Sequence, residues 1–199
     1  MKNILFTLAL LISFSSFGQT SAQYFKSGFD KFEAKDYYGA IADYTKAIEL
    51  NPNGDGSYYN RGLSKANLND HYGAIADFTK AIELNPNGDS YYNRGMSKAD
   101  LNDQYGAIAD YTKAIELDPK YYVAYNNRGN SKGKLKDYYG AIADYTKAIE
   151  LDPNYRNAYT NRGINKENLG DLNGACADWK KAARLGDADA AKWVANQCN

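Results

Sequence analysis

The stretch Tyr58-Tyr59-Asn60-Arg61-Gly62 decides the fold, because the chain returns to it at a fixed interval. Later copies read Tyr91-Tyr92-Asn93-Arg94-Gly95, Tyr125-Asn126-Asn127-Arg128-Gly129 and Tyr159-Thr160-Asn161-Arg162-Gly163, and a divergent first copy reads Tyr24-Phe25-Lys26-Ser27-Gly28. Successive glycines are 34, 33, 34 and 34 residues apart. A constant period of this length indicates a repeat architecture, in which each copy is one supersecondary unit.

Four further positions keep fixed distances from that glycine. Twelve residues after it stands an alanine: Ala40, Ala74, Ala107, Ala141 and Ala175. A large aromatic residue follows four positions later: Tyr44, Phe78, Tyr111, Tyr145 and Trp179. A second alanine comes three positions beyond: Ala47, Ala81, Ala114, Ala148 and Ala182. All four prolines share one phase, which only the fifth copy leaves empty: Pro52, Pro86, Pro119 and Pro153.

This phased set resembles the tetratricopeptide repeat, and the resemblance covers the chain from about Ser21 to its C-terminus. It implies an all-α fold, a right-handed superhelical α-solenoid of five tandem helix-turn-helix repeats. The residues agree, because each copy holds two segments with helical apolar spacing, and a proline follows the second segment, which it cannot continue. We expect repeats at 23–54, 55–87, 88–121, 122–155 and 156–186, and a capping helix within 187–199 that covers the last apolar face.

The first residues have the character of a secretory signal peptide, expected at 1–22 with cleavage near residue 18 or 22. Lys2 supplies a positive start, the apolar run Ile4–Phe14 follows, and small residues come next. The run is shorter than the roughly 20 residues that a spanning helix needs. No cysteine lies near the cleavage region, so we expect an exported, periplasmic or extracellular protein that is not a lipoprotein and has no integral membrane segment after processing.

Charge and chemistry exclude several classes of function. The 24 basic and 24 acidic residues are interleaved, whereas a nucleic-acid-binding protein carries a basic excess on at least one face. The single histidine, His71, has no cysteine partners nearby for a zinc site, and the carboxylates recur among lysines as on solvated helix faces. We therefore expect no catalytic residues, no metal, no cofactor and no enzyme activity, and a monomeric chain.

Two cysteines, Cys176 and Cys198, lie in the last repeat and the cap. Exported proteins meet oxidising conditions in which disulfides persist, so we predict a disulfide between them that attaches the cap to the array. The alternative is one small buried residue and one terminal thiol.

The resemblance also implies a binding surface, because the first helices of this family line a concave groove. Carried over by position, the groove candidates are Phe25, Phe29, Tyr59, Asn60, Leu63, Tyr92, Asn93, Met96, Asn126, Asn127 and Asn130. The expected function is a scaffold or adaptor that binds a protein or peptide there. The alternatives are a structural subunit of an envelope or secretion assembly that uses the convex faces, and a small-ligand or glycan binder. Some candidates could instead pack against the neighbouring repeat.

Ion pairs are predicted between repeats. An aspartate stands fifteen residues after every phased glycine, but the arginine before the glycine is replaced by Ser27 in the first copy. Pairing within a repeat would leave Asp43 without an arginine, whereas pairing with the next repeat's arginine leaves only Asp178, beside a cap where Asn196 holds the arginine's place. An arginine can hold a carboxylate with two hydrogen bonds, and the alternative is that both charges are separately solvated. The predicted pairs are Asp43–Arg61, Asp77–Arg94, Asp110–Arg128 and Asp144–Arg162.

Overall fold

A computed structural model describes residues 19–198 of the chain, and within them the regular structure is entirely helical. The signal-peptide prediction falls largely on residues 1–18, which lie outside the described part. The first helices of the five repeats are α1 (Ser21–Glu33), α3 (Asp55–Asn67), α5 (Gly88–Asp100), α7 (Tyr122–Lys134) and α9 (Arg156–Asn168). The second helices are α2 (Tyr37–Leu50), α4 (His71–Leu84), α6 (Gln104–Leu117), α8 (Tyr138–Leu151) and α10 (Leu172–Arg184). The last helix is α11 (Ala188–Gln197).

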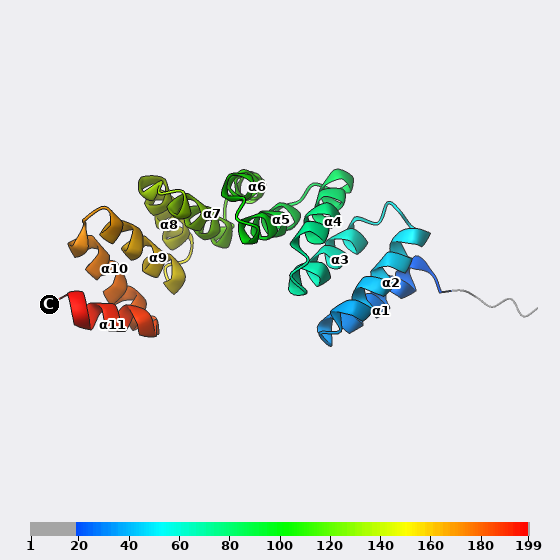
Figure 1. Cartoon of the computed structure of the whole chain (residues 1–199), viewed down its shortest axis with the longest axis horizontal. Helices are drawn as coiled ribbons and strands as arrows, with labels where there is room; N and C mark the ends of the chain where they lie inside the picture. The colour runs from blue at the N-terminus through cyan, green and yellow to red at the C-terminus, as the bar shows by residue number, and fades with distance from the viewer. Residues whose placement is uncertain (1–18, 199) are drawn as a thin grey trace, which may run out of the picture.

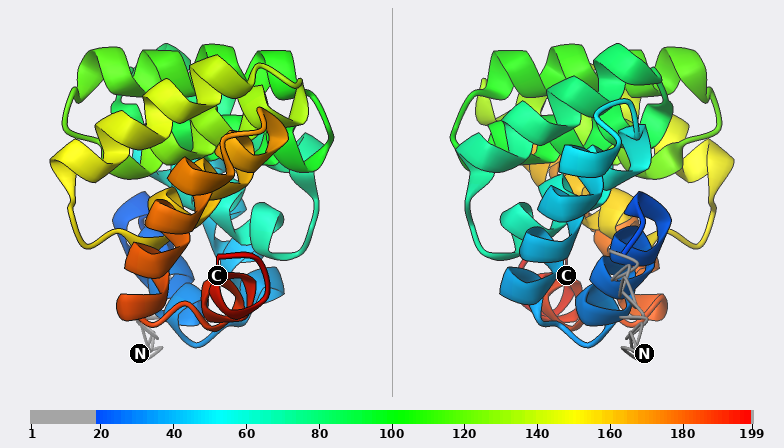
Figure 2. Two further views of the ribbon diagram at one scale, coloured as in Figure 1. Left: turned by 90° about the vertical axis from the view of Figure 1, so that its left-hand side faces the viewer. Right: turned by 90° about the vertical axis from the view of Figure 1, so that its right-hand side faces the viewer.

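The helices form a solenoid in which each packs chiefly on its neighbours in the chain. Figure 1 shows the helix pairs following one another along an arch, with α1 and α11 at opposite ends. The two end-on views show the arch winding into a superhelix whose two ends approach the same side (Figure 2). The all-α solenoid expected from the repeat is therefore confirmed.

Short polar turns join the two helices of each repeat. One turn residue adopts a left-handed backbone conformation, with φ between 61° and 64° at Lys35, Asn69, Asn102 and Lys136, and 82° at Gly170. An aspartate then caps the second helix, as where Asp36 Oδ1 accepts a hydrogen bond from the backbone N–H of Gly39 at 3.0 Å. These caps satisfy backbone donors that the helix start would leave unpaired.

The phased glycine and aromatic residue meet in the core of each repeat. A Cβ atom added at Gly95 would lie 2.9 Å from the ring of Tyr111, and the other four phased glycines face the aromatic ring of their own repeat in the same way. Tyr111 is 2% exposed, and the alanines on either side of it, Ala107 and Ala114, are fully buried. Small residues thus let the two helices approach closely around one large ring.

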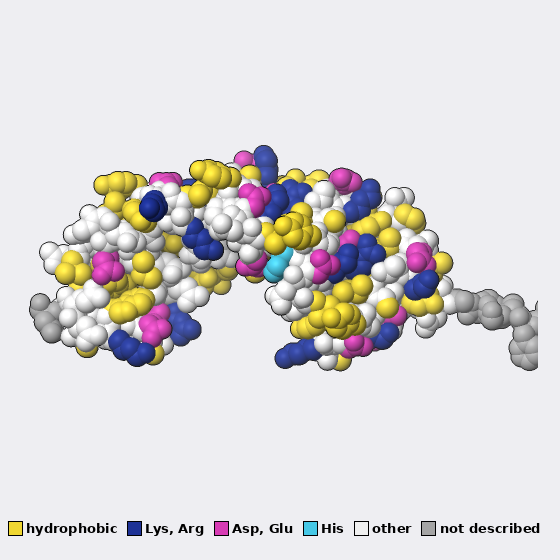
Figure 3. Space-filling model, viewed as in Figure 1, with side chains coloured by type: hydrophobic (Ala, Val, Ile, Leu, Met, Phe, Trp, Pro, Cys, Tyr) yellow, Lys and Arg dark blue, Asp and Glu magenta, His cyan; other side chains and the backbone are white. Residues whose placement is uncertain are grey.

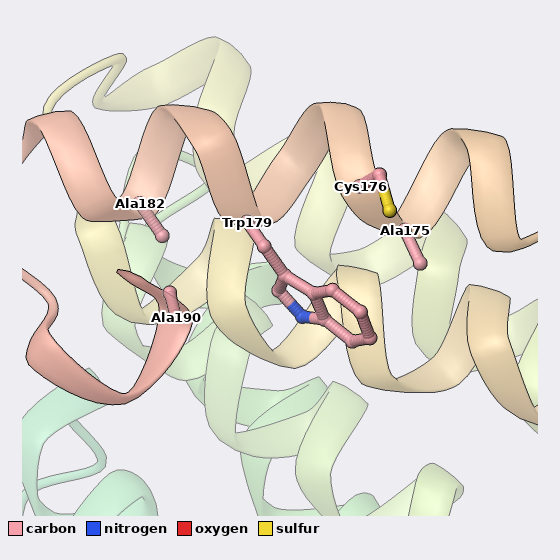
Figure 4. Close-up of a cluster of buried hydrophobic side chains, with 5 residues drawn as sticks. All are labelled: Ala175, Cys176, Trp179, Ala182 and Ala190. Carbon is pink, nitrogen blue, oxygen red and sulfur yellow. The ribbon is translucent and has the colours of Figure 1, made fainter. Parts of the chain in front are cut away.

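The capping helix closes the C-terminal end of the solenoid. Trp179 of α10 is buried and packs on Trp193 of α11, with ring centroids 5.2 Å apart, while Ala182 and Ala190 face one another across the two helices (Figure 4). The structure joins Cys176 to Cys198, the pairing that the sequence predicts, with Cα atoms 5.5 Å apart. Within residues 19–198, no cysteine is left as a free thiol.

The predicted ion pairs between repeats are wrong. Each arginine instead pairs inside its own repeat, and the pairs Asp43–Arg61, Asp77–Arg94, Asp110–Arg128 and Asp144–Arg162 do not form. The observed pairs, each 2.7 Å between Nη2 and Oδ1, are Arg61–Asp77, Arg94–Asp110, Arg128–Asp144 and Arg162–Asp178.

The physical reason lies in the helix hairpin, which brings residues sixteen apart on its two helices face to face. Arg61 donates from Nε and Nη2 to the two oxygens of Asp77, and Lys65 contacts the same carboxylate at 2.7 Å. The third arginine nitrogen, Nη1, donates to Thr45 Oγ1 of the preceding repeat at 3.1 Å. The arginine therefore does bridge repeats, but through a threonine hydroxyl rather than a second carboxylate.

The first repeat shows why matching charges at the ends of the array gave the wrong ion pairs. Asp43 has no arginine, but it accepts a hydrogen bond from the hydroxyl of Ser27 at 2.6 Å and pairs with Lys31 at 2.7 Å. The lysine four residues after the arginine position is present in all five copies, so the first carboxylate is matched within its own repeat after all.

Candidate functional site

Two adjoining hollows run along the first helices. The larger, about 520 Å³, is lined mainly by residues of α5, α7 and α9. The smaller, about 190 Å³, is lined by residues of α3, α4 and α5. Met96 and Asp100 border both, so the two form one surface depression, which we call the groove. The space-filling view shows the arch hollowed between its two limbs, with both signs of charge interspersed around it (Figure 3).

Several predicted groove residues lie where the resemblance implies. Met96, Asn127 and Asn130 line the larger hollow, and Leu63, Asn93 and Met96 line the smaller one. Met96 is 38% exposed, high for an apolar side chain in a helix that packs on both of its neighbours. The structure thus brings these residues together along one face; whether a partner binds there stays a prediction.

Tyr59 and Tyr92 contact residues of their own and the following repeat rather than the groove. Their rings pack on Phe78 and Tyr111 of their own repeats, with centroids 5.8 Å apart in both cases. Each hydroxyl accepts a hydrogen bond from an asparagine of the following repeat: Asn93 Nδ2 donates to Tyr59 at 3.1 Å, and Asn127 Nδ2 donates to Tyr92 at 2.9 Å. Neither tyrosine borders the two hollows, so packing between repeats, the alternative stated above, describes them better.

Burial also raises the pKa of one of these tyrosines. Burial raises the pKa of Tyr92 to about 12, the neighbouring Tyr155 adds to that rise, and the Asn127 hydrogen bond opposes it. A phenol is neutral at physiological pH even at its ordinary pKa, and the raised pKa keeps the hydroxyl neutral to higher pH while its oxygen accepts from the asparagine amide. A neutral ring and a neutral amide thus add to the contact between the third and fourth repeats, beside the Arg128 hydrogen bond to Thr112.

The remaining candidates lie apart from the groove or beneath it. Phe25 borders a separate hollow of about 400 Å³ between α1 and the start of α3, and Phe29 is 46% exposed without bordering either part of the groove. Asn60 turns back to its own helix, donating to the carbonyl of Gly56 at 2.8 Å. Asn126 is 3% exposed and lies beneath the surface.

Sequence reasoning missed residues that the structure places in the groove. Asn161 and Asn165 of α9 and Gly133 of α7 line the larger hollow. Asn165 stands where the three preceding repeats have a serine, and Gly133 stands where the second and third repeats have an alanine. For Asn165 and Gly133 the signal was therefore a departure from the repeat, whereas Asn161 occupies a phase that also holds Asn60, Asn93 and Asn127.

His71 borders the smaller hollow, with Nδ1 3.8 Å from Oδ2 of Asp100. That separation is longer than a hydrogen bond, and the aspartate side chain is 58% exposed. Within residues 19–198, no group of three or more histidine, cysteine or acidic side chains is placed to hold a metal ion. No helix in the same range has the length and hydropathy to span a membrane.

A second feature lies on the second helices. One tyrosine per repeat, at the second position of α2, α4, α6 and α8, is 77% exposed: Tyr38, Tyr72, Tyr105 and Tyr139. The fifth repeat has Asn173 there. The second helices thus present a regular row of exposed aromatic rings, which is a separate surface from the groove.

The fold and the groove define a helical-hairpin repeat protein of the interaction-scaffold class. Family models described as tetratricopeptide repeat match residues 57–87, 88–121 and 122–155, and a further one matches residues 31–53, together more than half of the chain. The chain belongs to the tetratricopeptide repeat family. No curated protein matches it in a sequence search.

Solved structures share the fold over most of their length. A MamA structure is 26% identical, with a TM-score of 0.77, and the match covers 82% of this chain and 96% of that one. MamA from residue 41 onward, from Desulfovibrio magneticus RS-1, is 20% identical with a TM-score of 0.80 and coverage of 84% and 96%. YrrB, described as a TPR protein with an unusual peptide-binding site, is 22% identical with a TM-score of 0.77 and coverage of 88% and 92%.

Proposed function

We propose that this protein is an exported scaffold that binds a segment of another protein, or a peptide, in the groove of its first helices. The observation that carries the proposal is the groove itself, two adjoining hollows that share Met96 and Asp100. Its lining combines the exposed Met96 and partly exposed apolar side chains with carboxamides, which suits recognition of a peptide by apolar contacts and hydrogen bonds. YrrB, which shares the fold, has a peptide-binding site, and this is consistent with the proposal.

The test is capture of partners from the native envelope with three baits. The wild-type chain is compared with Met96→Glu, which places a charge between the two hollows, and with Tyr105→Ala, which removes an exposed ring from a second helix. Both residues are exposed on helices, so both variants should fold, which circular dichroism checks. We expect Met96→Glu to lose the captured partner and Tyr105→Ala to keep it.

The row of exposed tyrosines favours a second candidate, a structural subunit of an envelope or secretion assembly held by its second helices. Exposed aromatic residues are enriched where proteins bind one another, and four rings at one phase give a regular surface. The same three baits separate the candidates, because this function requires that Tyr105→Ala lose the partner and that Met96→Glu keep it. That reversed outcome would replace the groove proposal.

Export is part of the proposal, and the start of α1 favours one of the two expected cleavage positions. Thr20 caps α1 by accepting from the backbone N–H of Gln23 at 3.2 Å, and Ser21 donates to the carbonyl of Ala47 at 2.9 Å. Cleavage near residue 22 would remove both contacts, whereas cleavage near residue 18 keeps them. The intact mass of the exported chain decides: a chain that starts at Gln19 fits the proposal, and an uncleaved chain retained in the cytoplasm refutes export.

A further inference from the structure

Five asparagines of α7 and α9 form one hydrogen-bonded group, which we call the amide cluster: Asn126, Asn127, Asn130, Asn161 and Asn165. All but the buried Asn126 line the larger hollow. Asn161 Nδ2 lies 3.2 Å from Asn126 Oδ1 and 3.0 Å from Asn130 Oδ1, so it links the two helices. Polar networks within a protein are costly unless their members are paired, so the pairing of each amide decides what the cluster can still bind.

The amide cluster exists because repeats four and five depart from the pattern of the other repeats. Asn130 stands at the phase of Leu63 and Met96, which line the groove with apolar side chains. Asn165 replaces a serine, and Gly133 replaces an alanine at the neighbouring phase. A Cβ atom at Gly133 would lie 2.9 Å from Asn165 Oδ1, so the glycine makes room for the larger amide. The missing Cβ atom at Gly133 thus compensates for the larger side chain at Asn165.

One acceptor of the cluster has no donor in the protein. Asn165 is 6% exposed, and its Nδ2 donates to the carbonyl of Asn161 at 2.8 Å, which fixes the orientation of the amide. Its Oδ1 is buried and unpaired. The hydroxyl of Tyr145 also lies against the Asn165 side chain, but it has a single proton and donates it to Asn130 Oδ1 at 2.9 Å. Leaving a buried acceptor unpaired is unfavourable, so this oxygen favours a ligand that brings a donor.

A donor is also left over beside that acceptor. Asn130 Nδ2 makes one contact, 3.5 Å to Asn127 Oδ1, at the outer limit of a hydrogen bond. Among the five amides of the cluster, Asn165 Oδ1 is therefore the buried acceptor left open, and Asn130 Nδ2 is a donor held only weakly. The charged residues that border the hollow, Asp100 and Lys134, are exposed at its rim.

This arrangement selects among ligand groups. An apolar side chain would leave Asn165 Oδ1 unpaired, and a carboxylate would bring a second acceptor and lose its hydration to neutral dipoles alone. A primary carboxamide supplies both an N–H donor, which Asn165 Oδ1 lacks, and a carbonyl acceptor for Asn130 Nδ2. We propose that the amide cluster binds the side-chain carboxamide of a glutamine or asparagine in the partner peptide. This inference rests on the proposed binding of a peptide in the groove.

The experiment is an NMR titration of the isotope-labelled full chain, following the side-chain amide signals of Asn130 and Asn165. The probes are N-acetylglutamine N-methylamide, its glutamate and leucine counterparts, and a glutamine derivative whose side-chain nitrogen carries two methyl groups. We expect the glutamine probe to shift both signals, and the other three to bind roughly tenfold or more weakly, the effect of one hydrogen bond lost at a buried group. Equal shifts with all four probes, or none, would overturn the proposal.

A variant built from the array's own residues provides the matched test. The double variant Asn165→Ser with Gly133→Ala restores the serine and alanine found at these phases in other repeats, so the helices keep a packing that the chain already uses. We expect it to lose the preference for the glutamine probe, while Tyr105→Ala retains it. If the double variant does not fold, the single change Asn130→Leu, the residue type at Leu63, must abolish the preference instead. Retention of the preference in the folded variant contradicts the assignment.

The outcomes also separate this inference from the proposed function. The disaccharide cellobiose serves as a further probe, and shifts with cellobiose but not with the glutamine probe would make the cluster a sugar site and overturn the inference. If the glutamine probe fails while Met96→Glu still abolishes partner capture, only the amide assignment falls. If Met96→Glu also leaves capture intact, the groove proposal falls with it.

Discussion

The first and second helices of the repeats have diverged to very different degrees. The second helices α2, α4, α6 and α8 share one fourteen-residue sequence, apart from their first residue and Phe78. The first helices keep only a tyrosine, the phased glycine and a lysine in all five copies. Their residue directly after the glycine is different in every repeat: Phe29, Leu63, Met96, Asn130 and Ile164.

The difference separates residues that build the array from residues that face the groove. The shared positions supply the core and the ion pairs, whereas four of the five residues that follow the glycine line the two hollows. Variation directly after the glycine therefore falls on residues that line the groove. The exposed tyrosines show the limit of this reasoning, because they are shared between repeats without being buried.

The largest expected effect comes from breaking a shared ion-pair set. Asp110 is buried and binds Arg94 and Lys98, both at 2.7 Å. Asp110→Ala should lower the free energy of unfolding by roughly 3–5 kcal/mol, because it leaves two mostly buried cations without a counter-charge. Urea unfolding measures the loss. Asp110→Ala and Arg94→Ala should also be strongly non-additive in a double-mutant cycle, and additivity would show that the pair contributes little.

The disulfide tests the one second helix that departs from the shared sequence, α10. Cys198→Ser should lower the free energy of unfolding by roughly 3 kcal/mol, because a link across 22 residues restricts the unfolded chain. Faster hydrogen exchange in α11 would locate the loss at the cap. The wild-type chain treated with a reductant is the matched control and should behave like the variant; unchanged melting after reduction would contradict the structural role.

Overpacking tests the glycine that all first helices share. Gly95→Leu should lower the free energy of unfolding by roughly 1–3 kcal/mol or more, because a side chain there meets the ring of Tyr111. Gly88→Ala is the control in the same helix, since a Cβ atom there has no contact closer than 3.6 Å. Thermal melting compares the two. Equal melting temperatures would mean that the shared glycine does not mark a close helix contact.

The smallest effect concerns the first repeat, where the carboxylate lacks an arginine. Burial raises the pKa of Asp43, but the hydrogen bonds from Lys31 and Ser27 and the charge of Lys31 together lower it by more. The pKa of Asp43 therefore lies below its ordinary value of 3.8. A lowered folded-state pKa adds stability above the ordinary value and loses it as the pH falls through the folded-state pKa. Wild type should exceed Asp43→Asn in unfolding free energy at pH 7, by less than the Asp110 effect, and the gap should shrink at pH 3. A gap that widens in acid would contradict this assignment.

The sequence was sufficient for the periodic part of the structure. The repeat, its helices and the last helix follow from residues that recur at one phase, because the same packing problem is solved five times. The ion pairs could not be assigned in the same way, since a count of charges along the chain does not tell which helix faces which. The lysine present in all five copies, Lys31 among them, was the missing part of that count.

The groove was predicted only in part for a related reason. Met96 and Asn130 were found because the family pattern names their position, but Tyr59 and Tyr92 at another named position bind neighbouring repeats instead. Asn165 and Gly133 matter through one contact between two helices, and that contact becomes visible only when the two are packed together. Asn165 and Gly133 each depart from the repeat pattern, but neither departure alone identifies a binding site.

Photo-cross-linking in the native envelope tests the central claim most directly, that the varied face of the first helices binds the partner. A photoreactive phenylalanine analogue replaces Met96 in the groove in one strain and Tyr105 on a second helix in another. The account predicts a discrete cross-linked partner from position 96 and none from position 105. Cross-links from position 105 alone would contradict it, because the partner would then lie on the face that the repeats share.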